Sequence, residues 1–294
     1  MPGTLTKRSD VVVPEILVEA IQGEFEGKQL LAGSGVAVTS NTLPNDKRGG
    51  DTVTVPYFET LGELEDIENE GDALTPEALS MEEETATVRH SGKAFEITEW
   101  ARMSAAGDPY AEAARQFQVI VARRADKALI DQATKDIAPE FVYDASDETT
   151  GLINYDVMIE ATGAWEDEQE EIALLGVHPK VYRDLLHLKT STGEPLLVLP
   201  TTGNKVPTFF GIPVVVSKKC KQFVDPGDGE TKYESIIAKR AALAFWYQAP
   251  TKVVTDYDAL ADTDLLAVHM YWASHRYKRV RGSTKPGVLH LITN

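Results

Sequence analysis

Histidine, cysteine and paired carboxylates are the side chains of this sequence that could bind a metal or take part in catalysis. The chain has six histidines and one cysteine, Cys220. The histidines lack the spacing of zinc ligands, and a lone thiol has no second cysteine with which to form a disulfide or a zinc site. We therefore predict no bound metal, and we assign structural or surface roles to the histidines. They are His90, His178, His187, His269, His275 and His290.

Motifs of nucleotide binding and of hydrolase chemistry are also missing from the sequence. The Gly-Ser-Gly stretch 33–35 lacks the third glycine of the dinucleotide-binding fingerprint, and Gly92 has Thr87 where a Walker A loop needs its first glycine. The sequence contains no GxSxG and no HExxH motif. The acids within 225–230 are not spaced as in an EF-hand. We predict no cofactor, no catalytic residues and a protein that is not an enzyme.

Negative charge is concentrated in one segment of the chain. With 46 acidic and 29 basic residues the net charge is −17, which disfavours sequence-specific binding to the phosphate backbone of DNA. Between residues 59 and 84 no side chain is basic. A solvated segment of this kind does not desolvate a carboxyl group as general acid catalysis requires, so we interpret it as an exposed projection. Its acids are Glu59, Glu63, Glu65, Asp66, Glu68, Glu70, Asp72, Glu77, Glu82, Glu83 and Glu84.

A hairpin and a long helix are predicted next to this acidic segment. The alternating stretches 51–58 and 85–97 are typical of strands and predict a long hairpin with the acids between them. Asp108-Pro109 is typical of a helix start, because aspartate can cap free N–H groups and proline is tolerated in the first turn. Apolar residues then recur every three or four positions and predict one helix that runs to Pro139.

The remainder of the chain predicts an α/β module followed by strands. We expect a helix over 156–169, a strand over 172–177 and a helix that begins at Pro179, with one apolar face formed by Val181, Leu185 and Leu188. Pro213 predicts that the strand 209–216 lies at a sheet edge or is irregular. The other predicted strands are 239–247, 252–257, 265–273 and 287–292.

Residues 1–50 predict an arm that depends on a partner for its order. A short stretch with apolar residues at helical spacing is followed by turn and loop residues, rich in glycine, proline and asparagine, rather than by further core residues. The basic residues near the N-terminus have no apolar region behind them, and no apolar stretch approaches the roughly 20 residues that span a bilayer. We therefore expect a soluble protein made in the cytoplasm, with no membrane contact.

Taken in order, these elements resemble the major capsid protein of tailed bacteriophages, which has the HK97-like fold. The most similar stretches are GVHPKVYRDL at 176–185, FGIPVVVS at 210–217 and IAKRAALAF at 237–245. The resemblance implies an α+β fold with four regions. These are an N-arm at 1–50, an E-loop at 51–98, a P-domain with a spine helix at 99–150 and 240–282, and an A-domain at 151–239 and 283–294.

This resemblance implies a structural coat protein. Members of the family assemble into pentamers and hexamers of an icosahedral shell around double-stranded DNA, and their E-loop and N-arm reach across neighbouring subunits. We accordingly expect a homo-oligomer located in the virion capsid and assembled in the host cytoplasm, which encloses DNA without reading its sequence. A portal and a separate scaffolding protein are partners that the resemblance implies, and some members of the family also bind a decoration protein. Because residues 49–88 contain no lysine, the E-loop crosslink of some relatives is not expected.

Two groups of residues are candidates for contacts between subunits. Apolar side chains set among the acids of the E-loop have no role in a solvated loop, and we expect them to dock on a neighbour; they are Phe58, Leu61, Leu64 and Ile67. A basic stretch that follows the last long strand could pair with the acidic hairpin of another subunit. Its candidates are Arg276, Lys278, Arg279 and Arg281.

Two alternatives stay open at the level of sequence. An encapsulin, the shell protein of a bacterial nanocompartment, looks similar to this chain, and the content of the shell would distinguish cargo enzymes from DNA. An acidic soluble α+β enzyme would need a buried catalytic constellation, and a stable monomer at high concentration would favour it.

Overall fold

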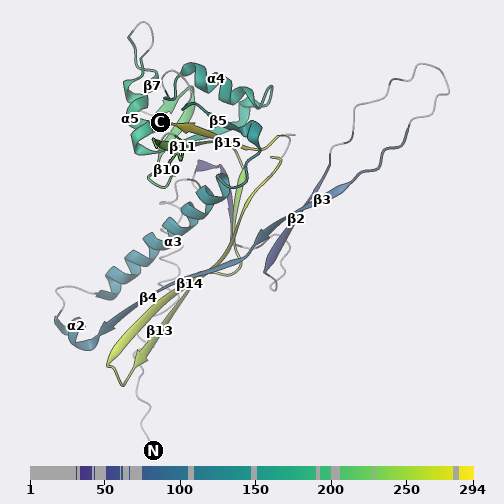
Figure 1. Cartoon of the computed structure of the whole chain (residues 1–294). Coiled ribbons are helices and arrows are strands. Elements are labelled where there is room, and N and C mark those ends of the chain that lie inside the picture. The colour runs from purple at the N-terminus through teal and green to yellow at the C-terminus, as the bar shows by residue number, and fades with distance from the viewer. Residues whose placement is uncertain are drawn as a thin grey trace, which may run out of the picture.

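The computed structural model describes most of the chain and places it in two sheet-based bodies with one long helix and one projecting hairpin (Figure 1). The described residues are 31, 34–41, 43, 51–59, 61, 66, 75–104, 109–146, 151–189, 193–199, 206–227, 229–280 and 285–294. Helices and sheets are both present, so the predicted α+β class is confirmed.

The chain passes more than once between the two bodies. Its elements, in chain order, are β1 (Ala37–Ser40), β2 (Thr52–Phe58), β3 (Met81–Thr87), β4 (Arg89–Thr98), α2 (Glu99–Ser104), α3 (Pro109–Ala133), η3 (Pro139–Phe141), β5 (Val142–Asp144), α4 (Tyr155–Gly163), η4 (Gln169–Glu171), β6 (Ile172–Val177), α5 (Pro179–His187), β7 (Leu197–Val198), β8 (Thr208–Phe209), β9 (Ile212–Val216), β10 (Gln222–Val224), β11 (Thr231–Lys239), β12 (Leu243–Tyr247), β13 (Lys252–Asp258), β14 (Thr263–Arg276) and β15 (Val288–Thr293).

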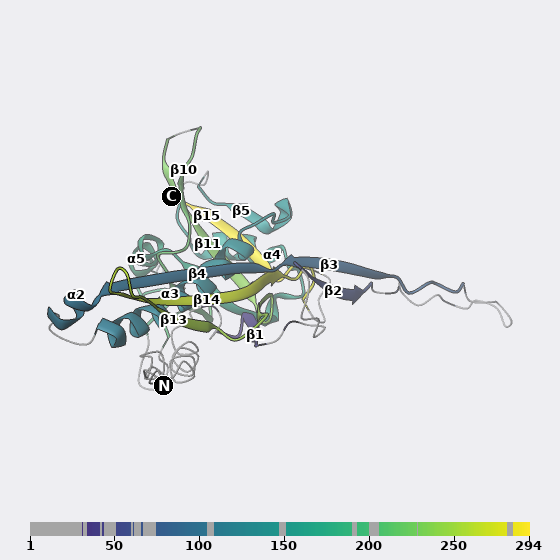
Figure 2. The ribbon, with the colours of Figure 1, turned by 90° about the horizontal axis from the view of Figure 1, so that it is seen from below.

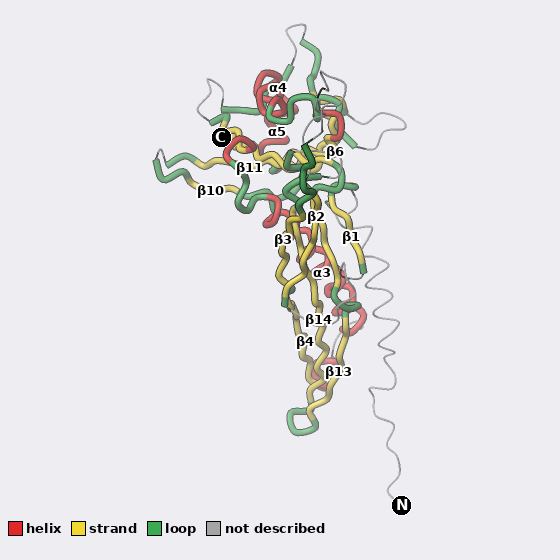
Figure 3. The backbone as a smooth tube through the Cα atoms, turned by 90° about the vertical axis from the view of Figure 1, so that its right-hand side faces the viewer, coloured by secondary structure: helices red, strands yellow, loops and turns green. Residues whose placement is uncertain are grey.

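The first sheet is built around β14. Its order in the described part is β1-β12-β14-β13, and β4 pairs with β14 over ten residues, from Thr263 to Trp272. Alternate side chains of β14, including Leu266, Val268 and Met270, are buried with the apolar face of α3. The opposite face of the sheet is turned away from α3. Figure 3 shows the helix running beside these long strands.

Helix α3 is long because small and apolar residues return to one face over seven turns. Ala113, Phe117, Val121 and Leu129 are buried along this face. The helix ends at Ala133, whereas the sequence had predicted that it would continue to Pro139. At this end the Thr134 hydroxyl and amide both donate to the carbonyl of Ile130. Asp136 then has a left-handed backbone with φ 48°, which changes the direction of the chain.

The second sheet forms the other body. Its described order is β5-β15-β11-β6-β9-β8-β7, with β10 also paired to β11, and α4 and α5 pack against it. Pro179 begins α5 as predicted, and His178 caps it by accepting a hydrogen bond from the Lys180 amide at 3.2 Å. Val181 and Leu185 are buried on the expected face. Helix α4 ends at Gly163 rather than near residue 169, because Glu166 takes a left-handed backbone.

The predicted strand 209–216 is a hairpin in the structure. Phe210 and Gly211 have φ values of 59° and 77°, which fold the chain back between β8 and β9. Strand β9 lies between β6 and β8, so of the two expectations for the strand with Pro213 the edge position is wrong and the irregularity is confirmed by the break at Phe210 and Gly211. The neighbouring β8 is only two residues long, and the next ladder bond, from the Val214 amide to Pro207, avoids the missing proline N–H.

A second predicted strand, 239–247, is likewise two strands. Strand β11 ends at Lys239 and β12 begins at Leu243, because Ala241 has a left-handed backbone with φ 56°. The two strands belong to different sheets. This turn is one of the places where the chain crosses between the two bodies.

The described part of the predicted arm is integrated into the body of its own chain. Strand β1 pairs in parallel with β12, and Val36 is fully buried in the same core as α3. The Leu31 amide donates to Asp126 on α3 at 3.3 Å. Residues 31 and 34–40 thus share the core of the first sheet and α3, unlike the arm that the glycine-rich sequence led us to expect. The rest of the predicted helical stripe lies outside the described residues.

Gly287 lies where three segments cross between the two bodies. Its carbonyl accepts a hydrogen bond from the Lys239 amide at 2.8 Å. A Cβ atom at this position would lie 2.2 Å from Val280 Cγ2 and 2.6 Å from Ala242 Cβ. The absence of a side chain is therefore what allows the segments to approach.

We expect Gly287→Ala to destabilise the unassembled chain by about 1–3 kcal/mol, because the added methyl group overpacks the crossing. Urea unfolding followed by circular dichroism measures the change. Gly163→Ala is the matched control, since nothing lies within 4 Å of a Cβ at the end of α4. Equal unfolding midpoints for the two variants would contradict the crowding.

Candidate intersubunit contact surface

The hairpin β2–β3 projects from one end of the long sheet, as Figure 2 shows. Its register pairs Thr52 with Thr87 at the base and Phe58 with Met81 at the outer end. Directly paired residues share a face, so the hairpin has one face formed around Val53 and another that ends in Phe58. The predicted hairpin is therefore present, although its second strand begins at residue 81 and not at 85.

The face around Val53 packs on the hairpin's own chain. Val53 and Ala86 are buried against Ala244, Trp246 and Ala273 of the first sheet. This cluster is small and covers only the base of the hairpin. The sequence 81–87 has an alternating pattern here because one face of the strand is buried and the other is solvated.

The outer end of the hairpin exposes large apolar side chains. Phe58 is 60% exposed and its cross-strand partner Met81 is 59% exposed. Leu61 and Leu79 also lie on the surface. Two of the four apolar candidates, Leu64 and Ile67, lie outside the described residues. The sequence analysis did not select Leu79 or Met81. The pairing of Met81 with Phe58 is visible only once the register is known.

A buried acid and a buried histidine fasten the base of the hairpin to the sheet. His275 Nε2 lies 2.5 Å from Glu84 Oε2, and both side chains are almost completely buried. The other oxygen of Glu84 accepts the Lys278 amide at 3.2 Å. Trp246 stacks on the His275 ring, and Tyr277 meets it edge-on. Both carboxylate oxygens of Glu84 are thus hydrogen-bonded, as a buried carboxylate requires.

The next acid along the same face of the hairpin is Glu82, which accepts a hydrogen bond from the Tyr57 hydroxyl. This bond lowers the pKa of Glu82, and the positive charges of Lys278 and Arg279 add to the effect. The same bond raises the pKa of Tyr57 to about 12. The negative charge of Glu82 therefore lies near positive charges of its own chain.

The four basic candidates occupy different environments. Arg276 is half-buried and donates to the Asp136 carbonyl at 2.7 Å, and burial lowers the pKa of its guanidinium. Lys278 and Arg279 are exposed beside the base of the hairpin. Arg281 lies outside the described residues. The structure thus brings acidic and basic residues together within one chain, whereas the sequence had suggested pairing between chains.

Cys220 and His290 lie in buried surroundings. Burial raises the pKa of the Cys220 thiol to about 12, so it is not a reactive thiolate. His290 lies beside Glu234 on the neighbouring strand. No group of three histidine, cysteine or acidic side chains that could hold a metal occurs among the described residues.

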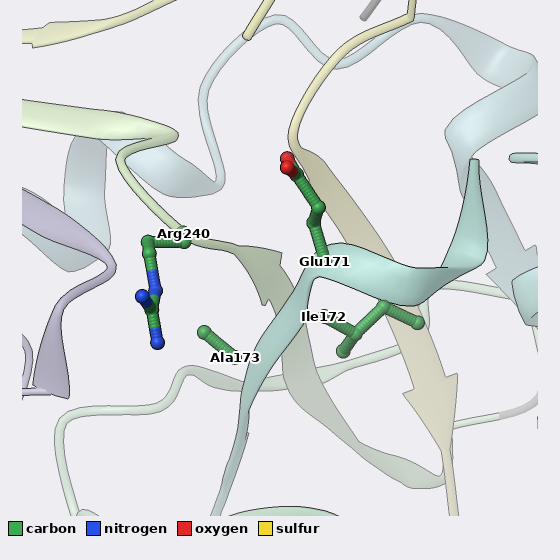
Figure 4. Close-up of a pocket in the computed structure, with 4 residues that line it drawn as sticks. All are labelled: Glu171, Ile172, Ala173 and Arg240. Atoms are coloured by element: carbon green, nitrogen blue, oxygen red, sulfur yellow. The ribbon is translucent and has the colours of Figure 1, made fainter. Parts of the chain in front are cut away.

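One hollow of the described surface lies next to the crossing between the sheets. It is lined by Glu171, Ile172, Ala173 and Arg240. Figure 4 shows the two charged side chains pointing away from each other, so they do not converge on a common ligand. Among the described helices, none has the length and apolar content needed to cross a membrane.

Comparison with solved structures defines the fold. The chain superposes on a protein of Microbacterium phage Oxtober96 with a TM-score of 0.63, at 13% identity and 90% coverage of both chains. It superposes on the capsid of Ralstonia phage GP4 with a TM-score of 0.59, at 12% identity, covering 92% of this chain and 90% of the other. These similarities show the fold, which is the HK97-like fold of phage coat proteins.

Sequence comparison then identifies the family. The model of the phage capsid protein family matches residues 80–277, so this chain belongs to that family. The major capsid protein of Bacillus phage SPP1 is 22% identical over 92% of this chain and 85% of its own length. That of Staphylococcus phage phiMR11 is 30% identical, but the match spans 45% of this chain and 46% of the relative. The predicted class of structural capsid protein is confirmed, and the encapsulin alternative is not favoured.

We expect Glu84→Ala to lower the free energy of unfolding by about 3 kcal/mol, because it leaves buried His275 and the Lys278 amide without their acceptor. Urea unfolding and the rate of proteolytic cleavage near the hairpin base measure the loss. Glu83→Ala changes the neighbouring exposed acid on the other face and should leave both quantities unchanged. An unaltered Glu84→Ala chain would show that this contact does not fasten the hairpin.

Proposed function

We propose that this chain is the major coat subunit of an icosahedral phage head, which assembles into pentamers and hexamers around double-stranded DNA. The observation that carries the proposal is the exposed apolar end of the β2–β3 hairpin. Phe58 and Met81 form a cross-strand pair at the outer end of the described hairpin, and more than half of each side chain is exposed. A second copy of the chain is the partner that explains such a projection.

Burial of these side chains can drive assembly. Removing a large apolar side chain from water contributes roughly 1.5–3 kcal/mol when burial is complete. Four of them, Phe58, Leu61, Leu79 and Met81, are exposed near this end. Ordering the hairpin opposes part of this gain. In a closed ring each subunit makes several such contacts at once, so modest contacts suffice to hold the shell together.

The basic residues beside the hairpin base are proposed to set the position of a neighbour. Lys278 and Arg279 are exposed, whereas Arg276 is already engaged within its own chain. Lys278 and Arg279 are therefore proposed to meet acids of an adjacent hairpin, and Arg281, which lies outside the described residues, is proposed with them from its place in the same basic stretch. Charge complementarity of this kind fixes the register of an interface and repels wrong partners.

Other parts of the proposal follow from the family. We assign a structural and not a catalytic role, assembly in the host cytoplasm, and DNA enclosure without sequence recognition. The net charge of −17 supports the last point, because an acidic inner wall does not adhere to DNA. A portal, a separate scaffolding protein and a decoration protein are the proposed partners. We also propose the division into N-arm, E-loop, P-domain and A-domain, in which the E-loop and N-arm contact neighbouring subunits.

We expect Phe58→Asp combined with Met81→Asp to abolish shell formation, because the apolar pair becomes charged and cannot be buried. Negative-stain electron microscopy and sedimentation of the expressed protein measure assembly, and circular dichroism checks that the subunit remains folded. Phe58→Leu with Met81→Leu is the matched control, since it keeps the pair apolar and should assemble. Normal shells from the aspartate variant would overturn the hairpin's role.

Reversing two basic charges should also impair assembly. Arg279→Glu with Arg281→Glu is expected to reduce the yield of shells while leaving the subunit folded, because like charges then face the acidic hairpin of a neighbour. The variant with lysine at both positions keeps the charge and should assemble as the parent does. Shells in undiminished yield from the glutamate variant would count against charge-guided registration.

A further inference from the structure

Two histidines that the proposed function does not use lie together on the outer face of the first sheet. His90 is on β4 and His269 is on β14, and the register pairs His90 with Tyr271 and His269 with Gly92. The two histidines are therefore diagonal neighbours on one face of an antiparallel pair. This face is turned away from α3, because the intervening Met270 is buried in the core beneath the helix.

The two rings are held at a short and defined separation. His90 Nε2 lies 3.1 Å from His269 Nδ1. Tyr271 stacks on the His90 ring with an angle of 10° between the planes and 4.4 Å between the centroids. A Cβ atom at position 92 would lie 3.0 Å from His269 Nδ1, so it is the bare Cα of Gly92 that leaves room for this ring. His90 is exposed and His269 is half-buried, so solvent reaches the pair.

This separation suits a shared metal ion. At metal–nitrogen bonds of about 2.0–2.1 Å and bond angles of about 90–110°, two ligand nitrogens are separated by roughly 2.9–3.4 Å. Neutral imidazole is a preferred ligand of nickel, copper and zinc. The two ring nitrogens lie within hydrogen-bonding distance of each other. Small ring rotations would direct a lone pair of each neutral imidazole at a shared ion.

We propose that His90 and His269 form a surface site for a divalent transition metal, with water in the remaining coordination positions. His275 and His290 differ from this pair, because each is buried beside an acid, Glu84 and Glu234 respectively. The nearest basic neighbours in the register and sequence are Lys252, opposite His269, and Arg89, whose guanidinium lies over Trp272 on the other face. With two protein ligands, the site binds more weakly than a structural zinc centre.

A metal at this position would join β4 to β14 close to the hairpin. Strand β4 follows β3 after a single residue, Val88. The bound ion would therefore link the strand that leads out of the hairpin to the central strand of the sheet. This gives the site a stabilising role that does not depend on the hairpin's contact with a neighbour.

Isothermal titration of the full-length unassembled chain with Ni²⁺ at pH 7.5 tests the proposal. We expect one ion to bind per chain. His90→Asn and His269→Asn should each weaken binding at least tenfold. Gly92→Ala keeps both ligands but crowds the His269 ring, and it should weaken binding as well. His187→Asn, which removes an exposed histidine on α5, should bind as the parent chain does.

Two outcomes would overturn the site. The first is no binding by the parent chain at millimolar Ni²⁺. The second is parent-like binding by both His90→Asn and His269→Asn, which would place the ion at other residues. Circular dichroism of each variant shows whether the chain is folded, so that a loss of binding is assigned to the site.

Discussion

The small contact at the base of the β2–β3 hairpin is the constraint on which the rest of the molecule depends. A two-stranded hairpin is marginally stable in water by itself. Here Val53 and Ala86 cover a few apolar residues of the first sheet, and Glu84 meets His275 in the same place. This contact fixes the direction in which the hairpin leaves the body. The apolar pair Phe58–Met81 at its outer end lies on the surface of the described chain.

The long sheet and α3 supply the rigidity that such a projection needs. Strand β14 pairs along both edges, and alternate side chains are buried under a helix of 25 residues. The second body is joined to this frame at several crossings, where Gly287 and Ala242 pack closely. The hairpin base therefore packs on a sheet whose other face is covered by α3.

Sequence patterns predicted those elements whose signals are local. Pro179 and the buried face of Val181 and Leu185 identified α5, and alternation identified β2. The errors arose where one left-handed residue divides an apolar run, as Phe210 and Ala241 do. An apolar run by itself does not reveal such a turn, since neither residue type favours a positive φ. The candidate contact surface was predicted through Phe58 and Leu61, but Met81 was not, because its partner is set by register.

The sequence by itself determined the concentration of acid between residues 59 and 84, the periodicity of α3 and the order of elements that resembles a phage coat protein. These properties depend on residue type and short spacing, which the chain carries in any conformation. Only the tertiary structure decided that Glu84 meets His275, 191 residues away, and that His90 meets His269. Such pairs depend on strand register and on which face of a sheet is buried, and many registers fit the same alternating pattern.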